Sequence, residues 1–339
     1  MPDIISFPAL GLNIPVDPIL TKIGPIDIHW YGIIIAIAFL MGGAILSKVS
    51  PIVGINADRS FDVLMGAFVG GVLCARLYYV AFTWDYYKDH LNELFHIWEG
   101  GLAIYGGLIG GFLTGALICR IRRVKTLPML DCAGMGLLVG QAIGRWGNFV
   151  NMEAFGDNTT LPWGMTSKSI VWYLESVAED LAAQGITVDP SLPVHPTFLY
   201  ESLWNLAGFF LIFFLLLPRR KFDGQIFLTY LFWYGLGRAW IEGLRTDSLM
   251  WGPFRVSQLV AVICAVVSLA VMAFCLIRWK AGRTKLLYCT TEESALAVSG
   301  ELYGKKPKQT EEAPETAEAA ETVENNDDNT VLTEEKEEL

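Results

Sequence analysis

The stretch from Gly144 to Gly156 carries residue types that bind anions, at the end of an apolar segment that begins near Pro128. It reads Gly-Arg-Trp-Gly-Asn-Phe-Val-Asn-Met-Glu-Ala-Phe-Gly. A guanidinium and two amides can hold a phosphate or a carboxylate. Asn148 and Asn151 are three residues apart, so they share a face if the helix continues that far. An arginine in the hydrocarbon region of a membrane costs about 2.5–3.5 kcal/mol on insertion scales, which favours a functional role with a specific partner. The structural alternative is an ion pair between Arg145 and Glu153 that closes the helix end.

A second set of polar residues follows a helical spacing. Four residues succeed each other at intervals of four, four and three positions, which places them on one helix face: Tyr234, Arg238, Glu242 and Arg245. A simple ion pair between successive helical turns also explains Arg238 and Glu242. The pattern therefore predicts a polar stripe at the end of an apolar helix, with either a binding or a structural role.

The remaining candidate site residues belong to two groups. Some lie in the stretch 144–156, and the others lie near the ends of other apolar segments that are predicted on the same side of the membrane. They are Tyr31, Tyr105, Asn148, Asn151, Gly156, His195 and Glu201. Each has a structural alternative, such as an aromatic anchor at the membrane interface for Tyr31 and a helix-entry residue for His195. Two or three arginines around one cavity suit the headgroup of an anionic phospholipid, because a guanidinium binds phosphate through two parallel hydrogen bonds.

The composition indicates what kind of protein positions these residues. Of the 339 residues, 53% are hydrophobic and 18% are charged, whereas soluble domains are about 25% charged. A bilayer is crossed by about 20 apolar residues. Segments of about that length are predicted at 28–46, 61–82, 102–119, 128–146, 196–217, 224–242 and 256–277. We therefore predict an all-α polytopic membrane protein, with seven transmembrane helices in a catalytic domain over residues 1–288.

The basic residues are distributed unevenly between the connecting segments. Thirteen Lys and Arg lie on one side, mostly within 120–125, 219–221 and 278–285, whereas the loops of the other side hold five. The positive-inside rule places the basic side in the cytoplasm. Seven spans then put the N-terminus outside and the C-terminus in the cytoplasm. The loop 151–195 becomes an outside head between spans four and five, and 83–100 an outside arm rich in aromatic residues.

The net charge of −10 belongs to the end of the chain. From Cys289 to Leu339, fifteen Asp and Glu oppose four Lys, which leaves the first 288 residues close to neutral. We predict that 289–339 is an acidic, disordered cytoplasmic tail, because its composition cannot bury a core. The sequence has no basic patch with interleaved aromatic residues, so nucleic-acid binding is not predicted. The six cysteines and four histidines show no spacing typical of a metal site.

Several of these stretches resemble bacterial prolipoprotein diacylglyceryl transferases. The signature of that family, Gly-Arg-x-Gly-Asn-Phe-hydrophobic-Asn-x-Glu-x-x-Gly, is matched at every fixed position of 144–156. The resemblance covers about residues 25–285. It also includes Trp30-Tyr31-Gly32, Gly106-Gly107-Leu108-Ile109-Gly110, His195-Pro196-Thr197-x-Leu199-Tyr200-Glu201, and the stripe from Tyr234 to Arg245. It implies a seven-helix membrane core with an outside head, located in the bacterial plasma membrane.

Members of this family move the diacylglyceryl group of phosphatidylglycerol onto the lipobox cysteine thiol in the signal peptide of a prolipoprotein. A thioether forms and glycerol phosphate is released. The resemblance implies catalytic roles for Arg145, Arg238, Tyr105 and Glu242. It implies phosphatidylglycerol binding by Arg145, Asn148, Asn151, Glu153, Gly156, Tyr31, Tyr234, Arg245, His195 and Glu201. No metal or organic cofactor is implied.

One position departs from many family members. They have a histidine, often assigned as the catalytic base, where this chain has Tyr105. A tyrosine with its ordinary pKa of about 10 is a poor base at neutral pH, so the phenol either orients the lipid or relays a proton with a pKa lowered by neighbouring arginines. Glu153 and Glu242 either hold the arginines or receive the thiol proton, and the spacing of Glu242 to Arg238 favours the orienting role for Glu242. The glycines that follow Tyr105 predict a helix-packing face. The alternative function is a flippase of anionic phospholipid or an anion transporter, which would use the same arginines without forming a thioether.

Overall fold

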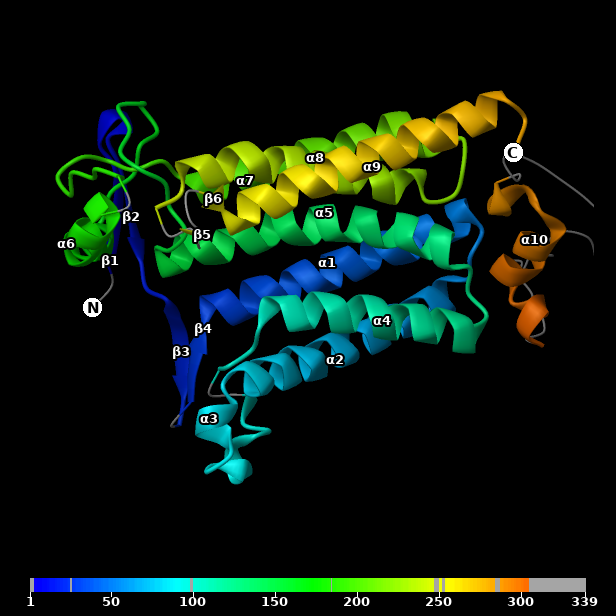
Figure 1. The fold of residues 1–339 in the computed structure, drawn as a ribbon, viewed down its shortest axis with the longest axis horizontal. Coiled ribbons are helices and arrows are strands. Elements are labelled where there is room, and N and C mark those ends of the chain that lie inside the picture. The colour runs from blue at the N-terminus through cyan, green and yellow to red at the C-terminus, as the bar shows by residue number, and fades with distance from the viewer. Residues whose placement is uncertain are drawn as a thin grey trace, which may run out of the picture. The chain divides into compact units, whose positions relative to one another are not determined.

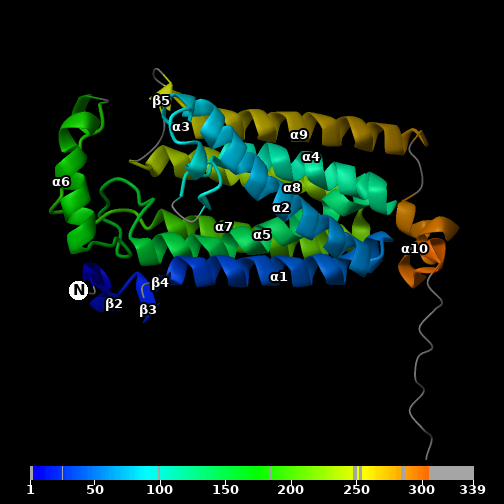
Figure 2. The same cartoon turned by 90° about the horizontal axis from the view of Figure 1, so that it is seen from below.

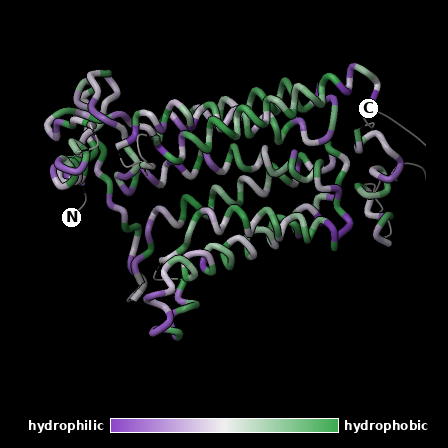
Figure 3. Tube along the Cα trace, in the orientation of Figure 1, coloured by the Kyte–Doolittle hydropathy of each residue, from purple (hydrophilic) through white to green (hydrophobic). Residues whose placement is uncertain are grey.

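The computed structural model describes residues 3–24, 26–97, 100–183, 185–246, 250–251, 254–283 and 287–304. Met1–Lys305 form one compact unit. In this unit long helices run side by side, with short β-hairpins and one further helix at one end (Figure 1). The long helices are mostly apolar along their middle parts, and hydrophilic residues concentrate at their ends and in the connecting segments (Figure 3).

Six helices in the described part of the chain are long and apolar enough to cross a membrane. They are α1 (Trp30–Val53), α2 (Ala57–Phe82), α4 (Ile104–Arg122), α5 (Thr126–Asn151), α7 (Thr197–Phe210) with its continuation to Arg219, and α9 (Val256–Lys280). The protein is therefore an integral, mostly helical membrane protein, as predicted. The helix α8 (Gln225–Ile241) has 17 residues and packs against α5, α7 and α9.

The helices pack in pairs, with α2 against α4, α1 against α5, α5 against α7, and α8 against α9 (Figures 1 and 2). The α2–α4 pair depends on glycine. A Cβ atom at Gly106 would lie 2.4 Å from Cβ of Tyr78, and one at Gly110 would lie 2.2 Å from Cβ of Cys74. The packing face predicted for the glycine run after Tyr105 is therefore confirmed.

Antiparallel hairpins precede or interrupt the helices. Those among the described residues are β1 (Asp3–Phe7) with β2 (Leu12–Val16), β3 (Ile19–Ile23) with β4 (Ile26–His29), and β5 (Met250–Trp251) with β6 (Phe254–Arg255). They were not predicted from the sequence. In the head loop, α6 (Lys168–Ala183) buries Ile170 and Leu174 in one cluster with Ile5 of β1. The first hairpin and the head therefore share a small hydrophobic core.

The segment predicted as an outside arm, 83–100, contains the short helix α3 (Trp84–Tyr87). The buried Arg76 of α2 donates hydrogen bonds of 2.7–3.1 Å to four carbonyl oxygens at the base of this arm, those of Glu93, Leu94, Gly100 and Gly101. This arginine therefore fastens the arm to α2. Two arm residues, Trp98 and Glu99, lie outside the described residues.

The prediction of a disordered tail from residue 289 onward is wrong for its first part. Residues 287–304 form α10 (Glu292–Ser299) between two single 3-10 turns. Thr291 caps this helix by accepting a hydrogen bond from the backbone N–H of Ser294. The prediction used the average acidic composition of the whole tail, which does not reveal a short helix with a good N-cap. Residues 305–339 lie outside the described residues.

The folded C-terminal segment packs against the helix ends opposite to the hairpins (Figure 1). Ser294 Oγ donates a hydrogen bond of 3.0 Å to the carbonyl of Gly54. Nearby, Lys125 Nζ lies 3.0 Å from an oxygen of Glu293. These contacts join α10 to the end of α1 and to the start of α5, so the segment is part of the fold.

Candidate functional site

One buried carboxylate joins arginines from three parts of the chain. Glu201 of α7 lies with Oε2 2.6 Å from Nη2 of Arg145 on α5. Its Oε1 lies 2.7 Å from Nη1 of Arg238 on α8 and 4.0 Å from Nη1 of Arg245. The Glu201 side chain is 4% exposed. The structure therefore unites polar residues that the sequence placed on spans four, five and six.

The stripe on α8 adds a second buried carboxylate. Glu242, 2% exposed, lies with Oε2 2.6 Å from Nη2 of Arg238, which confirms the ion pair suggested by the spacing of four residues. Three guanidinium groups then lie close to two buried carboxylates. The arginine side chains keep some exposure, 22% for Arg145, 15% for Arg238 and 12% for Arg245. Such a cluster offers fixed, partly accessible cations to an anion.

The signature stretch turns sharply after α5 and forms a hydrogen-bonded chain. Arg145 Nη1 donates to Asn148 Oδ1 at 3.1 Å, and Asn148 Nδ2 donates to Glu153 Oε1 at 2.9 Å. Asn151 Nδ2 donates to the same oxygen at 3.4 Å. Arg145 is thus linked to Glu153 through Asn148 and forms its ion pair with Glu201 instead. The amides and the arginine end up on one surface, as their spacing predicted.

Gly156 lets three segments meet beside the arginines. Its N–H donates to the carbonyl of His195 at 2.9 Å, and it forms a β-bridge with Arg245. A Cβ atom at this position would lie 2.7 Å from Cβ of His195 and 2.9 Å from the carbonyl oxygen of Leu244. The last position of the signature is therefore a backbone contact, which holds Arg245 next to the head.

His195 belongs to a hydrogen-bonded group on the head. Its Nδ1 lies 3.0 Å from the hydroxyl of Tyr200, which also accepts a hydrogen bond of 2.7 Å from Trp163 Nε1. Its Nε2 lies 3.7 Å from a carboxylate oxygen of Asp157. Burial lowers the pKa of His195, and the Asp157 charge partly opposes this shift. His195 therefore connects the head to α7. Sequence reasoning missed Asp157 and Trp163, which no spacing relates to His195.

The three predicted tyrosines differ in their surroundings. Tyr31 of α1 lies against the signature, since a Cβ atom at Gly147 would be 2.7 Å from its ring. Tyr234 stacks on Tyr230, with ring centroids 6.0 Å apart. Tyr105 lies in the first turn of α4 and is 43% exposed. In the described part of the chain its hydroxyl shares no hydrogen bond with the arginine cluster.

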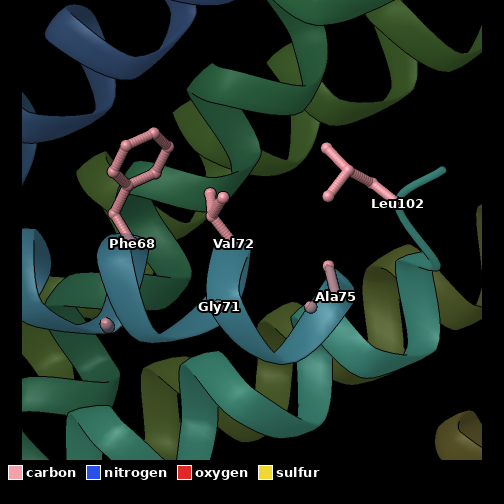
Figure 4. A pocket seen from close by; sticks show the side chains of 7 residues that line it. Phe68, Gly71, Val72, Ala75 and Leu102 are labelled. Atoms are coloured by element: carbon pink, nitrogen blue, oxygen red, sulfur yellow. The ribbon is translucent and has the colours of Figure 1, made fainter. Parts of the chain in front are cut away.

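An apolar groove of about 270 Å³ lies elsewhere, along α2 and the start of α4 (Figure 4). It is lined by Ala67, Phe68, Gly71, Val72, Ala75, Leu102 and Gly107. None of these residues belongs to the predicted site. The chemistry that the structure assembles is therefore at the arginine–carboxylate cluster, and the groove offers only apolar contact.

The sequence of this chain matches a known protein family. The family model described as Prolipoprotein diacylglyceryl transferase matches residues 18–274. A relative in Acaryochloris marina (strain MBIC 11017) is 43% identical over 248 residues, which are 73% of this chain and 86% of the relative. One in Clostridioides difficile (strain 630) is 43% identical, over 70% of this chain and 87% of the relative. One in Limosilactobacillus reuteri (strain DSM 20016) is 41% identical, over 77% of this chain and 92% of the relative.

All three relatives carry the name phosphatidylglycerol–prolipoprotein diacylglyceryl transferase. The family match includes α1, α2, α4, α5, α7 and α8, and with them every residue of the arginine–carboxylate cluster. By the extent of this match, the chain belongs to the prolipoprotein diacylglyceryl transferase family.

Proposed function

We propose that this protein transfers the diacylglyceryl group of phosphatidylglycerol to the lipobox cysteine of prolipoproteins, which begins lipoprotein maturation. The observation that carries the proposal is the cluster around Glu201, where three partly exposed arginines meet two buried carboxylates at one end of membrane helices. An anionic phospholipid headgroup is the ligand that suits this charge and place. The names of the relatives specify the same lipid and acceptor.

In the proposed reaction the cysteine sulfur attacks the glycerol carbon that bears the phosphate ester. A C–S bond forms and the C–O bond breaks, and its electron pair leaves with glycerol phosphate. A thiol with an ordinary pKa of about 8.5 is a few per cent ionised at neutral pH and is strongly nucleophilic. The proton leaves to water or to the exposed carboxylate of Glu153.

The arginines act on the departing phosphate. Arg145 and Arg238 stabilise the charge that gathers there in the transition state more than in the bound lipid, which lowers the barrier. Glu201 and Glu242 hold these guanidinium groups in place, so no reorganisation is needed during the reaction. The buried position of Glu242 beside Arg238 supports the orienting role rather than a role as base.

The other predicted residues surround the lipid in this proposal. Lipid contacts are assigned to Tyr31, Asn148, Asn151, Glu153, Gly156, His195, Glu201, Tyr234 and Arg245. Tyr105 orients the lipid from α4 rather than accepting the thiol proton, a role that the exposure of its side chain supports. The acceptor is the signal peptide of an exported prolipoprotein.

We further propose seven transmembrane spans in the bacterial plasma membrane, with the N-terminus outside and the C-terminus in the cytoplasm. The seventh span is α8, whose 17 residues reach the lower limit for crossing a bilayer. The basic clusters at 120–125, 219–221 and 278–285 support the orientation. The arginine cluster then faces the outside, where exported prolipoproteins emerge.

The test separates this reaction from lipid or anion transport. Purified protein in detergent is mixed with phosphatidylglycerol and a lipobox peptide, and the peptide mass is followed. We expect a thioether product with the wild-type peptide and none with a peptide in which the cysteine is replaced by serine. Bound phosphatidylglycerol without any thioether would overturn the proposal and favour a translocation function.

A further inference from the structure

Two tryptophans form a reciprocal contact between α7 and α8, close to the ion pair of Glu201 and Arg238. Trp204 Nε1 donates a hydrogen bond of 2.9 Å to the carbonyl of Trp233. Trp233 Nε1 donates one of 2.8 Å to the carbonyl of Trp204. The indole rings stack at 4.6 Å between centroids, with 20° between their planes. Each indole N–H thus has a partner, and each partner lies on the other helix.

The contact has the same sequence pattern on both helices, a tryptophan followed by a glycine four residues later. A Cβ atom at Gly237 would lie 2.3 Å from Nε1 of Trp204, and one at Gly208 would lie 2.4 Å from Nε1 of Trp233. The atoms that such a Cβ atom would contact belong to rigid indole rings. They cannot move aside as the end of a flexible side chain can. Both glycines are therefore required for the indoles to lie flat on the opposite helix.

The reciprocal contact lies next to the proposed catalytic cluster. Glu201 precedes Trp204 by three residues on α7, and Arg238 directly follows Gly237 on α8. A slip of α8 by one residue would move Arg238 by about 1.5 Å along the helix and turn it by about 100°. The 2.7 Å contact between Arg238 and Glu201 would not survive that change.

In a membrane, apolar side chains alone define the register between two helices poorly, because lipid tails are as apolar as those side chains. Hydrogen bonds with fixed direction define it well. We propose that Trp204 and Trp233 are positioning residues, which set the register of α7 and α8 and thereby hold Arg238 against Glu201. The inference rests on the proposed transfer reaction, in which Arg238 stabilises the departing phosphate.

The test uses size complementation within the contact. Gly237→Ala brings a methyl group against the Trp204 indole, and Trp204→Ala removes the ring atoms that this methyl group would meet. We expect Gly237→Ala to lower kcat on the order of 10²-fold, the loss that a displacement of about 1 Å can cause, with a change in KM below about 3-fold. The double variant should recover at least about 5-fold of that loss, because the two changes act on one contact.

The matched control is Gly140→Ala on α5, where a Cβ atom would meet its nearest neighbour at an ordinary 3.6 Å. It should keep wild-type kcat. The proposal is overturned if Gly237→Ala transfers like wild type, or if the losses of the two single variants multiply in the double variant. If Gly237→Ala does not fold, Trp204→Phe and Trp233→Phe replace it, and wild-type kcat in both then overturns the proposal. Absence of transfer in the wild type contradicts the proposed function instead.

Discussion

Arg145 and Arg238 bind opposite oxygens of one carboxylate, at 2.6 and 2.7 Å from Glu201. The two guanidinium groups come from helices that are separate in sequence, and their charges would repel at this distance without the carboxylate between them. Glu201 therefore brings both cations to one place, where each guanidinium side chain stays partly exposed to a ligand. In the proposed reaction that ligand is the phosphate of the lipid.

Replacing Glu201 by glutamine should destabilise the protein and nearly abolish transfer. The amide keeps the volume but removes the charge that three arginines share, and breaking a buried ion pair costs about 3–5 kcal/mol. We expect a lower midpoint of thermal unfolding in detergent, and a rate reduced by about 10²-fold or more. Glu175→Gln, on the exposed face of α6, is the control. Wild-type stability and rate in Glu201→Gln would show that this carboxylate is not the centre of the cluster.

Tyr105→Phe separates the two roles predicted for this tyrosine. If the phenol orients the lipid, the variant keeps its turnover within about 3-fold of wild type, since one hydrogen bond to lipid is worth about 1 kcal/mol, and the loss falls on KM for phosphatidylglycerol. We expect this result, because the side chain is exposed and its hydroxyl is not hydrogen-bonded to the arginines in the described chain. If initial rates instead show turnover slowed by about 10²-fold or more, the phenol takes part in the proton transfer.

The stability of the head should depend on pH through His195. Burial lowers its pKa below the usual 6.5, so the folded protein favours the neutral ring while the unfolded chain takes up a proton first. Unfolding should therefore become easier as the pH falls below about 6.5, and the change should level off once the folded protein is protonated too. His195→Asn should reduce this dependence, measured as thermal midpoints between about pH 7.5 and 5. An equal slope in both proteins would contradict the assignment.

The folded C-terminal segment should contribute to stability although the family match ends at residue 274. A chain that stops after Leu286 loses the hydrogen bond of Ser294 to Gly54 and the ion pair of Glu293 with Lys125. We expect its thermal midpoint to fall by at least about 4 °C relative to a chain that stops after Gly304. Equal midpoints would show that α10 packs on the bundle without stabilising it.

The sequence predicted those parts of the site that depend on spacing along one helix. The four-residue interval of Arg238 and Glu242 predicted their ion pair, and the signature around Arg145 predicted the shared face of the two asparagines. The central role of Glu201 could not be predicted, because it depends on which helices are neighbours. For the same reason the signature suggests Glu153 as the structural partner of Arg145, whereas the ion pair is with Glu201.

The fold was predictable where long apolar runs determine it, and less so at the ends of the chain. The hairpin of β1 and β2 combines a proline-rich stretch with short alternation of apolar and polar residues around Gly11. This pattern is a weaker indication of a hairpin than the seven long apolar segments are of helices. The helix α10 lies in an acidic region whose average composition indicates disorder, and only its cap at Thr291 points to helix.

The most direct test of the account is the rate of diacylglyceryl transfer by Arg145→Ala, measured beside wild type and Arg219→Ala. Arg219 is exposed and bonds only the carbonyl of Leu215 among the described contacts, so its replacement should leave the rate unchanged. We predict that Arg145→Ala lowers the rate on the order of 10²–10³-fold, with a smaller loss of phosphatidylglycerol binding. Transfer at the wild-type rate in Arg145→Ala would contradict the central claim that this cluster stabilises the departing phosphate.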